Sequence, residues 1–100
     1  MTMTINKRTE GTTLFFSPVG RLDTTTAPEL EEELTAAIVG IKELILDFGD
    51  VSYVSSAGLR VILKMQKLMK AHGGMKVTGA NAMVMEVFEI TGFTDFLTFV

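Results

Sequence analysis

Residues 44–63 constrain the fold of this chain more than any other stretch, because they join a buried strand to a helix. The triplet 44–46 is apolar without alternation, which is typical of a strand covered on both faces of a sheet. After a short extended segment come Ser55 and Ser56, and beyond them charged residues recur at steps of three and four. This pattern predicts a helix that begins at the two serines.

The predicted helix has a charged face and an apolar face. The charged positions are Arg60, Lys64, Lys67 and Lys70, and the apolar ones are Leu59, Ile62, Leu63, Leu68 and Met69. We interpret the charged face as solvent-exposed rather than as a docking surface. In the segment before the helix, Val51 and Tyr53 are expected to point toward the core, with Val54 as a further candidate.

The composition describes one compact domain over residues 1–100, with 47% hydrophobic and 21% charged residues. A net charge of -3 argues against nucleic acid as the main partner, since binding to a phosphate backbone normally needs a basic domain. Without cysteine no disulfide is possible, and with a single histidine we expect no metal site and no cofactor. The longest apolar run, near residues 36–39, is far too short to span a membrane. We therefore expect a cytoplasmic protein without membrane insertion.

Two strands are predicted before the first helix. Met3 and Ile5 alternate with polar residues, and the strand they indicate is expected to pair with residues 12–17 through a tight turn. Pro18 cannot donate to a strand ladder, so we expect it at the end of the second strand or on a sheet edge. Residues 20–23 and the threonines after them are expected to form a loop.

Further helices and strands complete the predicted order. Thr26 and Glu29 have the spacing of a capping box, and the helix that they start is expected to end at Gly40. A strand is predicted at residues 75–78, Asn81 can cap a third helix, and the tail is expected to form a turn and a last strand. The order β-β-α-β-α-β-α-β predicts an α/β fold, with a mixed four- to five-stranded sheet and helices packed against it.

The two adjacent serines have a structural and a chemical explanation. One serine suffices to cap a helix, which is what serine most often does at such a position. The second is a candidate hydroxyl beside free backbone N–H groups, where an attached phosphate would meet a favourable dipole.

A serine hydrolase is the enzymatic alternative, and the spacing of the residues argues against it. Ser56 and His72 lie sixteen residues apart on one predicted helix, which separates them by about 24 Å. The chain also lacks the Gly-x-Ser-x-Gly and Gly-Lys-Ser/Thr motifs of hydrolases and phosphate-binding loops. We therefore expect a binding protein and not an enzyme.

Residues 47–63, DFGDVSYVSSAGLRVIL, resemble the signature of STAS domains, the family of bacterial anti-sigma factor antagonists with the SpoIIAA-like fold. Residues 20–23 and 88–93 resemble the family's loop before its first helix and its last helix and turn. The resemblance implies that Ser56 is phosphorylated by an anti-sigma factor with serine kinase activity and dephosphorylated by a PP2C-type phosphatase. The unphosphorylated domain would bind the anti-sigma factor and free sigma, which regulates transcription by partner switching.

The neighbourhood of Ser56 is expected to form the partner-binding surface, with Asp23, Ser55, Ala57, Gly58 and Leu59 as its members. The family mostly has aspartate in place of Ser55, and often serine or threonine in place of Ala57. A side chain at Gly58, as in Gly58→Val, is expected to weaken binding and to cost little helix stability. Asp23 resembles an acidic family position near the phosphorylated serine, although aspartate before a helix is also an ordinary loop or capping residue.

One alternative within the family remains open at this point. STAS domains also serve as subunits of ABC-type transporters and of sensor complexes, in which the serine need not be modified. The fold that the resemblance implies is the same in both cases, so only the partner and the phosphorylation of Ser56 distinguish them.

Overall fold

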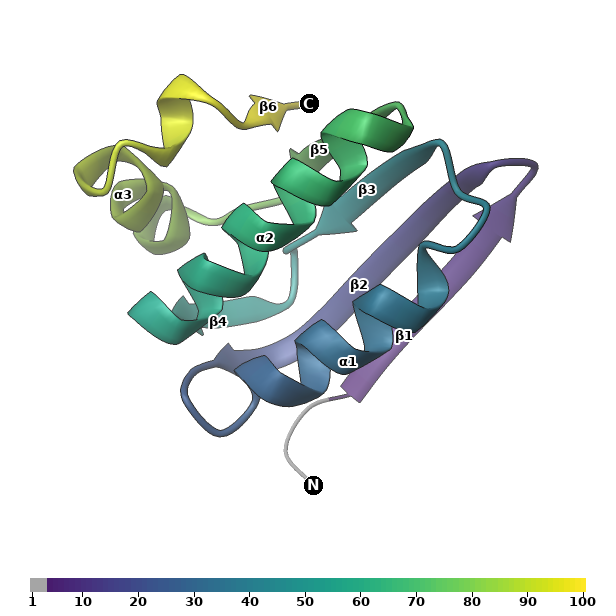
Figure 1. Ribbon diagram of the computed structural model, residues 1–100. Coiled ribbons are helices and arrows are strands. Elements are labelled where there is room, and N and C mark those ends of the chain that lie inside the picture. Colours follow the sequence, from purple (N-terminus) through teal and green to yellow (C-terminus); the bar gives the residue numbers. More distant parts are fainter. Residues whose placement is uncertain (1–3) are drawn as a thin grey trace.

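The computed structural model describes residues 4–100, which form the alternating helices and strands of Figure 1. Their order is β1 (Thr4–Glu10), β2 (Thr13–Leu22), α1 (Ala27–Ala37), β3 (Glu43–Asp47), β4 (Val51–Val54), α2 (Ser56–His72), β5 (Gly74–Thr78), α3 (Ala82–Ile90), the 3-10 helix η1 (Phe93–Asp95) and β6 (Thr98–Phe99). The predicted α/β order is confirmed, and β4 is a strand in addition to those predicted.

The sheet is mixed, as predicted, with the strand order β1-β2-β3-β5-β6 and with β4 paired to β2 off this path. β1 and β2 are antiparallel, whereas the other strand pairs are parallel. β2 is long enough to pair with two parallel strands, one after the other along its length. Residues 13–16 pair with β3, and from Gly20 onward β2 pairs with β4, which carries the chain into α2.

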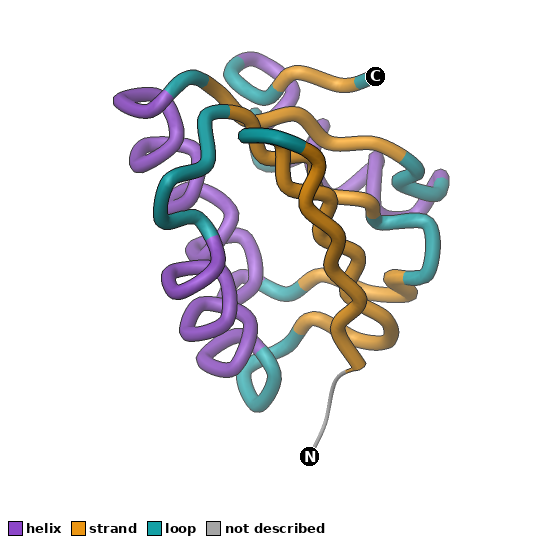
Figure 2. The backbone as a smooth tube through the Cα atoms, turned by 90° about the vertical axis from the view of Figure 1, so that its right-hand side faces the viewer, coloured by secondary structure: helices purple, strands orange, loops and turns teal. Residues whose placement is uncertain are grey.

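Helices α1 and α2 pack against each other and lie together on one side of the sheet (Figure 2). α3 packs instead against β4 and η1. Phe88 of α3 reaches the core by stacking on Phe48, with 6.2 Å between the ring centroids. Within residues 4–100 there is no helix with the length and apolar character needed to cross a membrane.

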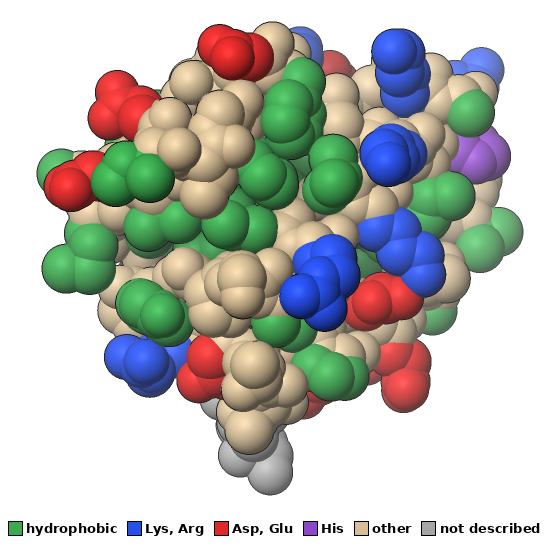
Figure 3. Space-filling view, turned by 60° about the vertical axis from the view of Figure 1, so that its left-hand side comes forward, with side chains coloured by type: hydrophobic (Ala, Val, Ile, Leu, Met, Phe, Trp, Pro, Cys, Tyr) green, Lys and Arg blue, Asp and Glu red, His purple; other side chains and the backbone are tan. Residues whose placement is uncertain are grey.

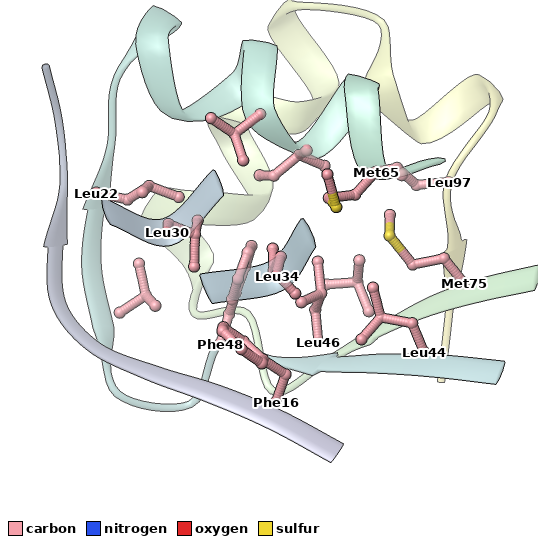
Figure 4. Close-up of a cluster of buried hydrophobic side chains, with 14 of the residues drawn as sticks. Phe16, Leu22, Leu30, Leu34, Leu44, Leu46, Phe48, Met65, Met75 and Leu97 are labelled. Atoms are coloured by element: carbon pink, nitrogen blue, oxygen red, sulfur yellow. The ribbon is translucent and has the colours of Figure 1, made fainter. Parts of the chain in front are cut away.

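The core lies between the helix pair and the sheet, where the side chains of both layers meet (Figure 4). Leu30 and Leu34 of α1 are fully buried, as the predicted apolar stripe of this helix requires. The strands supply the facing side chains from alternate positions, which in β2 are Leu14 and Phe16. This packing fixes the position of α2, and therefore of its first residue, relative to the ends of β2 and β4.

The predicted boundaries of α2 and the predicted cap of α3 are confirmed, whereas α1 ends at Ala37 and not at Gly40. α2 begins at Ser56 with Ser55 as its N-cap, and it ends at His72 before Gly73. α3 is capped as predicted, because the side-chain oxygen of Asn81 accepts a hydrogen bond from the Val84 N–H. The prediction for Met3 lies outside the described residues.

Pro18 lies inside β2, so the expected strand end is wrong, but at this position β2 is paired on one side alone, as a residue on a sheet edge is. The proline falls between the residues that pair with β3 and those that pair with β4. Its missing N–H is tolerated because β2 has a strand partner there only on the β1 side, where Ile5 lies opposite. Residues 20–22 were expected in a loop, and they extend β2 instead.

The position of Tyr53 differs from the expected one. Val51 and Val54 are the buried residues of β4, whereas Tyr53 is exposed. The guanidinium of Arg21 lies over the Tyr53 ring, 4.4 Å from its centroid. An aromatic ring is stable at the surface in this arrangement because the cation is attracted to its face.

Candidate functional site

The site is the junction at which β4 passes into α2. The Ser55 backbone is extended, and its hydroxyl oxygen accepts a hydrogen bond from the Gly58 N–H at 3.3 Å. The Ser55 N–H donates to the Leu22 carbonyl oxygen at 2.8 Å, which ties the start of α2 to the end of β2. Ser55 is therefore the capping serine of the pair.

Ser56 is the first residue of α2 and is exposed. Its hydroxyl makes no hydrogen bond with any residue in the range 4–100. It lies beside backbone N–H groups that have no partner within the helix, at the positive end of the helix dipole. His72 is the last residue of the same helix, so the structure does not bring an imidazole to the Ser56 hydroxyl.

Two of the predicted surface residues point into the molecule. Leu59 is only 8% exposed and belongs to the core. Gly58 is buried against β2, and a Cβ added there would lie 2.6 Å from Leu22 Cγ. The expectation that Gly58 borders the partner surface is therefore wrong, because the helix turns this residue toward the sheet.

Ala57 is half-buried, so part of this residue remains exposed at the surface. It lines a shallow groove between α1 and α2, together with Thr24, Ala27, Pro28, Glu31, Arg60, Val61 and Lys64. Ala57 is the residue after Ser56, and the cations Arg60 and Lys64 of α2 line the groove further along the helix. A partner that covers Ser56 would contact this border as well.

Asp23 organises the loop that precedes α1. One of its carboxylate oxygens accepts hydrogen bonds from the Thr25 hydroxyl at 2.7 Å and from the Thr25 N–H at 3.0 Å. The other oxygen pairs with the Arg21 guanidinium at 3.6 Å. Asp23 directly follows Leu22, whose carbonyl holds the Ser55 N–H, so the loop and the start of α2 are adjacent. A direct contact of Asp23 with a partner stays a prediction.

Thr26 precedes α1 as predicted, but its side chain does not cap the helix. The Thr26 hydroxyl is buried and donates to the Arg21 carbonyl oxygen at 2.7 Å, and it accepts from the Asp23 N–H at 2.8 Å. These hydrogen bonds of Thr26 hold the end of the loop against its beginning. The expected cap is wrong because the Thr26 hydroxyl accepts its hydrogen bond from the Asp23 N–H before the helix and not from an N–H of the first turn.

The hydrogen bond from the Thr25 hydroxyl is the main cause that lowers the pKa of Asp23 from its ordinary value of 3.8. Desolvation acts in the opposite direction, and the N–H groups of Thr25 and Thr26 add to the lowering. The folded loop therefore favours the carboxylate. Its contribution to stability is present above the unfolded pKa and is lost as the pH falls through the lowered folded pKa.

Thr25→Ala is expected to raise the pKa of Asp23 toward 3.8, because the variant loses the hydroxyl bond to the carboxylate. The measurement is an NMR titration of the Asp23 carboxyl carbon across the acid range. Thr24→Ala is the matched control, since Thr24 is an exposed threonine of the same loop that makes no bond to Asp23. An unchanged pKa in Thr25→Ala, or an equal rise in Thr24→Ala, would contradict this account.

The role of Arg21 and Tyr53 in this site was not predicted from the sequence. Arg21 stacks on Tyr53 and pairs with Asp23, so the ends of β2 and β4 and the loop form one connected surface beside Ser56. The only signal for it was the short spacing between Arg21 and Asp23, which does not reveal the partner ring on another strand.

The mixed sheet, the helix pair on one side of it and the serine at the start of α2 define the class of protein. The family model of the STAS domain matches residues 4–100, and the chain belongs to this family. BtrV of Bordetella bronchiseptica is 41% identical over 76 residues, which are 74% of this chain and 66% of BtrV. The anti-sigma-B factor antagonist of Bacillus subtilis is 33% identical over 79 residues, which are 78% of this chain and 72% of that protein.

Solved structures support the same fold. The anti-sigma factor antagonist SpoIIAA in its unphosphorylated form matches with a TM-score of 0.82 at 18% identity, over 97% of this chain and 88% of SpoIIAA. SpoIIAA, a cell fate determinant of Bacillus, has also been solved in its phosphorylated form. The predicted SpoIIAA-like fold is confirmed.

Proposed function

We propose that this protein is an anti-sigma factor antagonist whose binding to an anti-sigma factor is switched off by phosphorylation of Ser56. The proposal rests on the different environments of the two serines. Ser55 is half-buried and caps α2, whereas Ser56 is exposed with a hydroxyl that bonds no other residue in 4–100. The antagonist from Bacillus subtilis supports the class of partner, since it is a relative over most of this chain.

The proposed cycle depends on two enzymes that act on this protein. In the forward step the Ser56 oxygen attacks the γ-phosphorus of ATP bound to the anti-sigma factor kinase, ADP leaves, and the hydroxyl proton passes to a base of the kinase. In the reverse step a PP2C-type phosphatase transfers the phosphoryl group to water. This chain supplies the acceptor and the binding surface, and the catalysis belongs to the other proteins. The cycle takes place in the cytoplasm, where sigma factors act.

The helix start is suited to carry the phosphate without unfolding. Free N–H groups and the positive end of the helix dipole favour an anion at Ser56. The effect of the phosphate is therefore exerted on the partner, which must approach a dianion that the fold itself tolerates.

Phosphopeptide mapping tests the assignment of the acceptor. The protein is incubated with ATP and candidate anti-sigma factor kinases, and the peptide with Ser55 and Ser56 is analysed by mass spectrometry. Phosphate is expected on Ser56, is expected to remain in Ser55→Ala, and is expected to be absent from Ser56→Ala.

Phosphate found only on Ser55, or phosphate that persists in Ser56→Ala, would refute the assignment. If no kinase modifies either serine and the domain is recovered in a complex with transporter subunits, the function of a transporter or sensor subunit replaces the one proposed.

A further inference from the structure

The outward side of α2 carries a cation that has no role in the fold. Arg60, Lys64 and Lys67 are exposed on this helix, and Lys and Arg side chains gather on one flank of the face in Figure 3. Lys64 forms an ion pair with Glu31 of α1. Arg60 makes no ion pair or hydrogen bond with any residue in the part of the chain that the structure describes.

Arg60 lies one helical turn after Ser56. Four residues of α-helix correspond to a rise of about 6 Å, and they leave the two side chains about 40° apart around the axis. Side chains at this spacing are neighbours, with their Cβ atoms about 5–6 Å apart. The long side chain of Arg60 can therefore place its guanidinium beside a group attached to the Ser56 oxygen.

The other cations near the site are engaged or distant. Arg21 lies over the Tyr53 ring and pairs with Asp23. Lys64 is a further turn along α2 and is held by Glu31. Lys67 follows Ser56 by about 16 Å along the helix axis. Among residues 4–100, Arg60 is thus the cation of α2 that is both free and within reach.

We infer that the guanidinium of Arg60 binds the phosphate group on Ser56 and holds it against the first turn of α2. The inference rests on the proposed function, because it needs the phosphorylated form of Ser56. Arginine suits this role, since its planar guanidinium donates two parallel hydrogen bonds to phosphate oxygens. Ser55 is uncharged and occupied as the cap, so it does not compete with the phosphate for Arg60.

Phosphorylation then changes the surface of this site in two ways. It adds a dianion at Ser56, and it draws the guanidinium of Arg60 out of solvent toward the start of the helix. A partner that covers this face meets an anion and also loses a cation that it could have contacted. Arg60 is therefore the positioning residue of the phosphorylated state.

The test uses protein with phosphoserine installed at position 56 during translation, so that it does not depend on finding the kinase. The pKa of the phosphate is measured by phosphorus NMR in the wild-type background, in Arg60→Gln and in Lys67→Gln, a variant that removes a cation of the same helix and leaves the Lys64–Glu31 ion pair intact. The ordinary second pKa of phosphoserine is about 6, and a bound guanidinium lowers it by favouring the dianion. Asp23 and Glu31, the nearby carboxylates, are present in all three proteins, so their repulsion cancels in the comparison.

Arg60→Gln is expected to raise the phosphate pKa by on the order of half a unit, whereas Lys67→Gln leaves it close to the wild-type value. The difference between wild type and Arg60→Gln is expected to shrink in 1 M salt, where charges at the surface are screened within about 3 Å. The Arg60 side-chain N–H signal is also expected to shift on phosphorylation.

Equal phosphate pKa values in wild type and Arg60→Gln, or an equal rise in Lys67→Gln, would overturn the inference. Either result leaves the proposed function standing, because kinase mapping and partner binding test that separately. Conversely, a chain that no kinase phosphorylates can still give the expected pKa shift, and then only the proposed function fails.

Discussion

Ser56→Asp is expected to lower the affinity for the anti-sigma factor by roughly 30-fold to several thousand-fold and to leave the melting temperature unchanged. A charge buried under a partner surface without a counter-charge typically costs about 2–5 kcal/mol of binding free energy. The fold tolerates the aspartate because Ser56 is exposed at the start of α2, where the helix dipole favours an anion. Calorimetric titration measures the affinity, and thermal denaturation followed by circular dichroism measures the stability.

Two control variants test whether the loss of affinity depends on a negative charge and on the place where that charge lies. Ser56→Ala is expected to bind like the wild type and to stay bound when ATP is added. Thr9→Asp places the same charge at an exposed position of β1, opposite Leu14 and far along β2 from Leu22, and is expected to bind normally. If Ser56→Asp and the phosphorylated protein both bind as tightly as the wild type, the domain is not a partner switch.

Gly58→Val is expected to destabilise the fold rather than to disturb binding alone. An added Cβ would lie 2.6 Å from Leu22 Cγ and 3.1 Å from the Leu22 carbonyl oxygen. That oxygen also accepts the Ser55 N–H bond, so a shift of β2 would loosen the start of α2. Overpacking of this kind costs about 1–3 kcal/mol, which lowers the melting temperature of a domain of this size by roughly 5–20 °C.

Ala57→Val is the matched control, because it adds a branched side chain one residue away at a half-buried position that lines a groove. Its melting temperature is expected to stay near that of the wild type. A second comparison uses Leu22→Ala, which removes the atoms nearest to the added Cβ, and Gly58→Val is expected to cost less in that background. A melting temperature for Gly58→Val equal to that of the wild type would show that this residue faces solvent after all.

The features that the sequence predicted correctly depend on local signals. Charged residues at steps of three and four placed α2, and the two serines marked its start within one residue. Asn81 identified the beginning of α3 for the same reason, since a cap is a contact between residues three apart in the chain. The exposed Ser56 followed from these local rules together with the resemblance to a known family.

The features that were predicted incorrectly depend on partners distant in sequence. Pro18 suggests the end of a strand, and only the change of neighbour from β3 to β4 explains why β2 continues through it. Tyr53 looks like a core residue until Arg21 is known to lie over its ring. Gly58 could be placed in the first turn of α2, but the side of the turn that β2 covers depends on how the helix packs on the sheet.

In the first turn of α2, some residues maintain the fold and others are exposed to a partner. Gly58 and Leu59 are fixed by β2 and the core, whereas Ser56 and Arg60 face outward without a structural task. After a gene duplication, the outward residues of such a domain can change without loss of stability. Two copies in one cell can therefore acquire separate partners while keeping the same scaffold, and crosstalk between their pathways is limited by a few exchangeable surface residues.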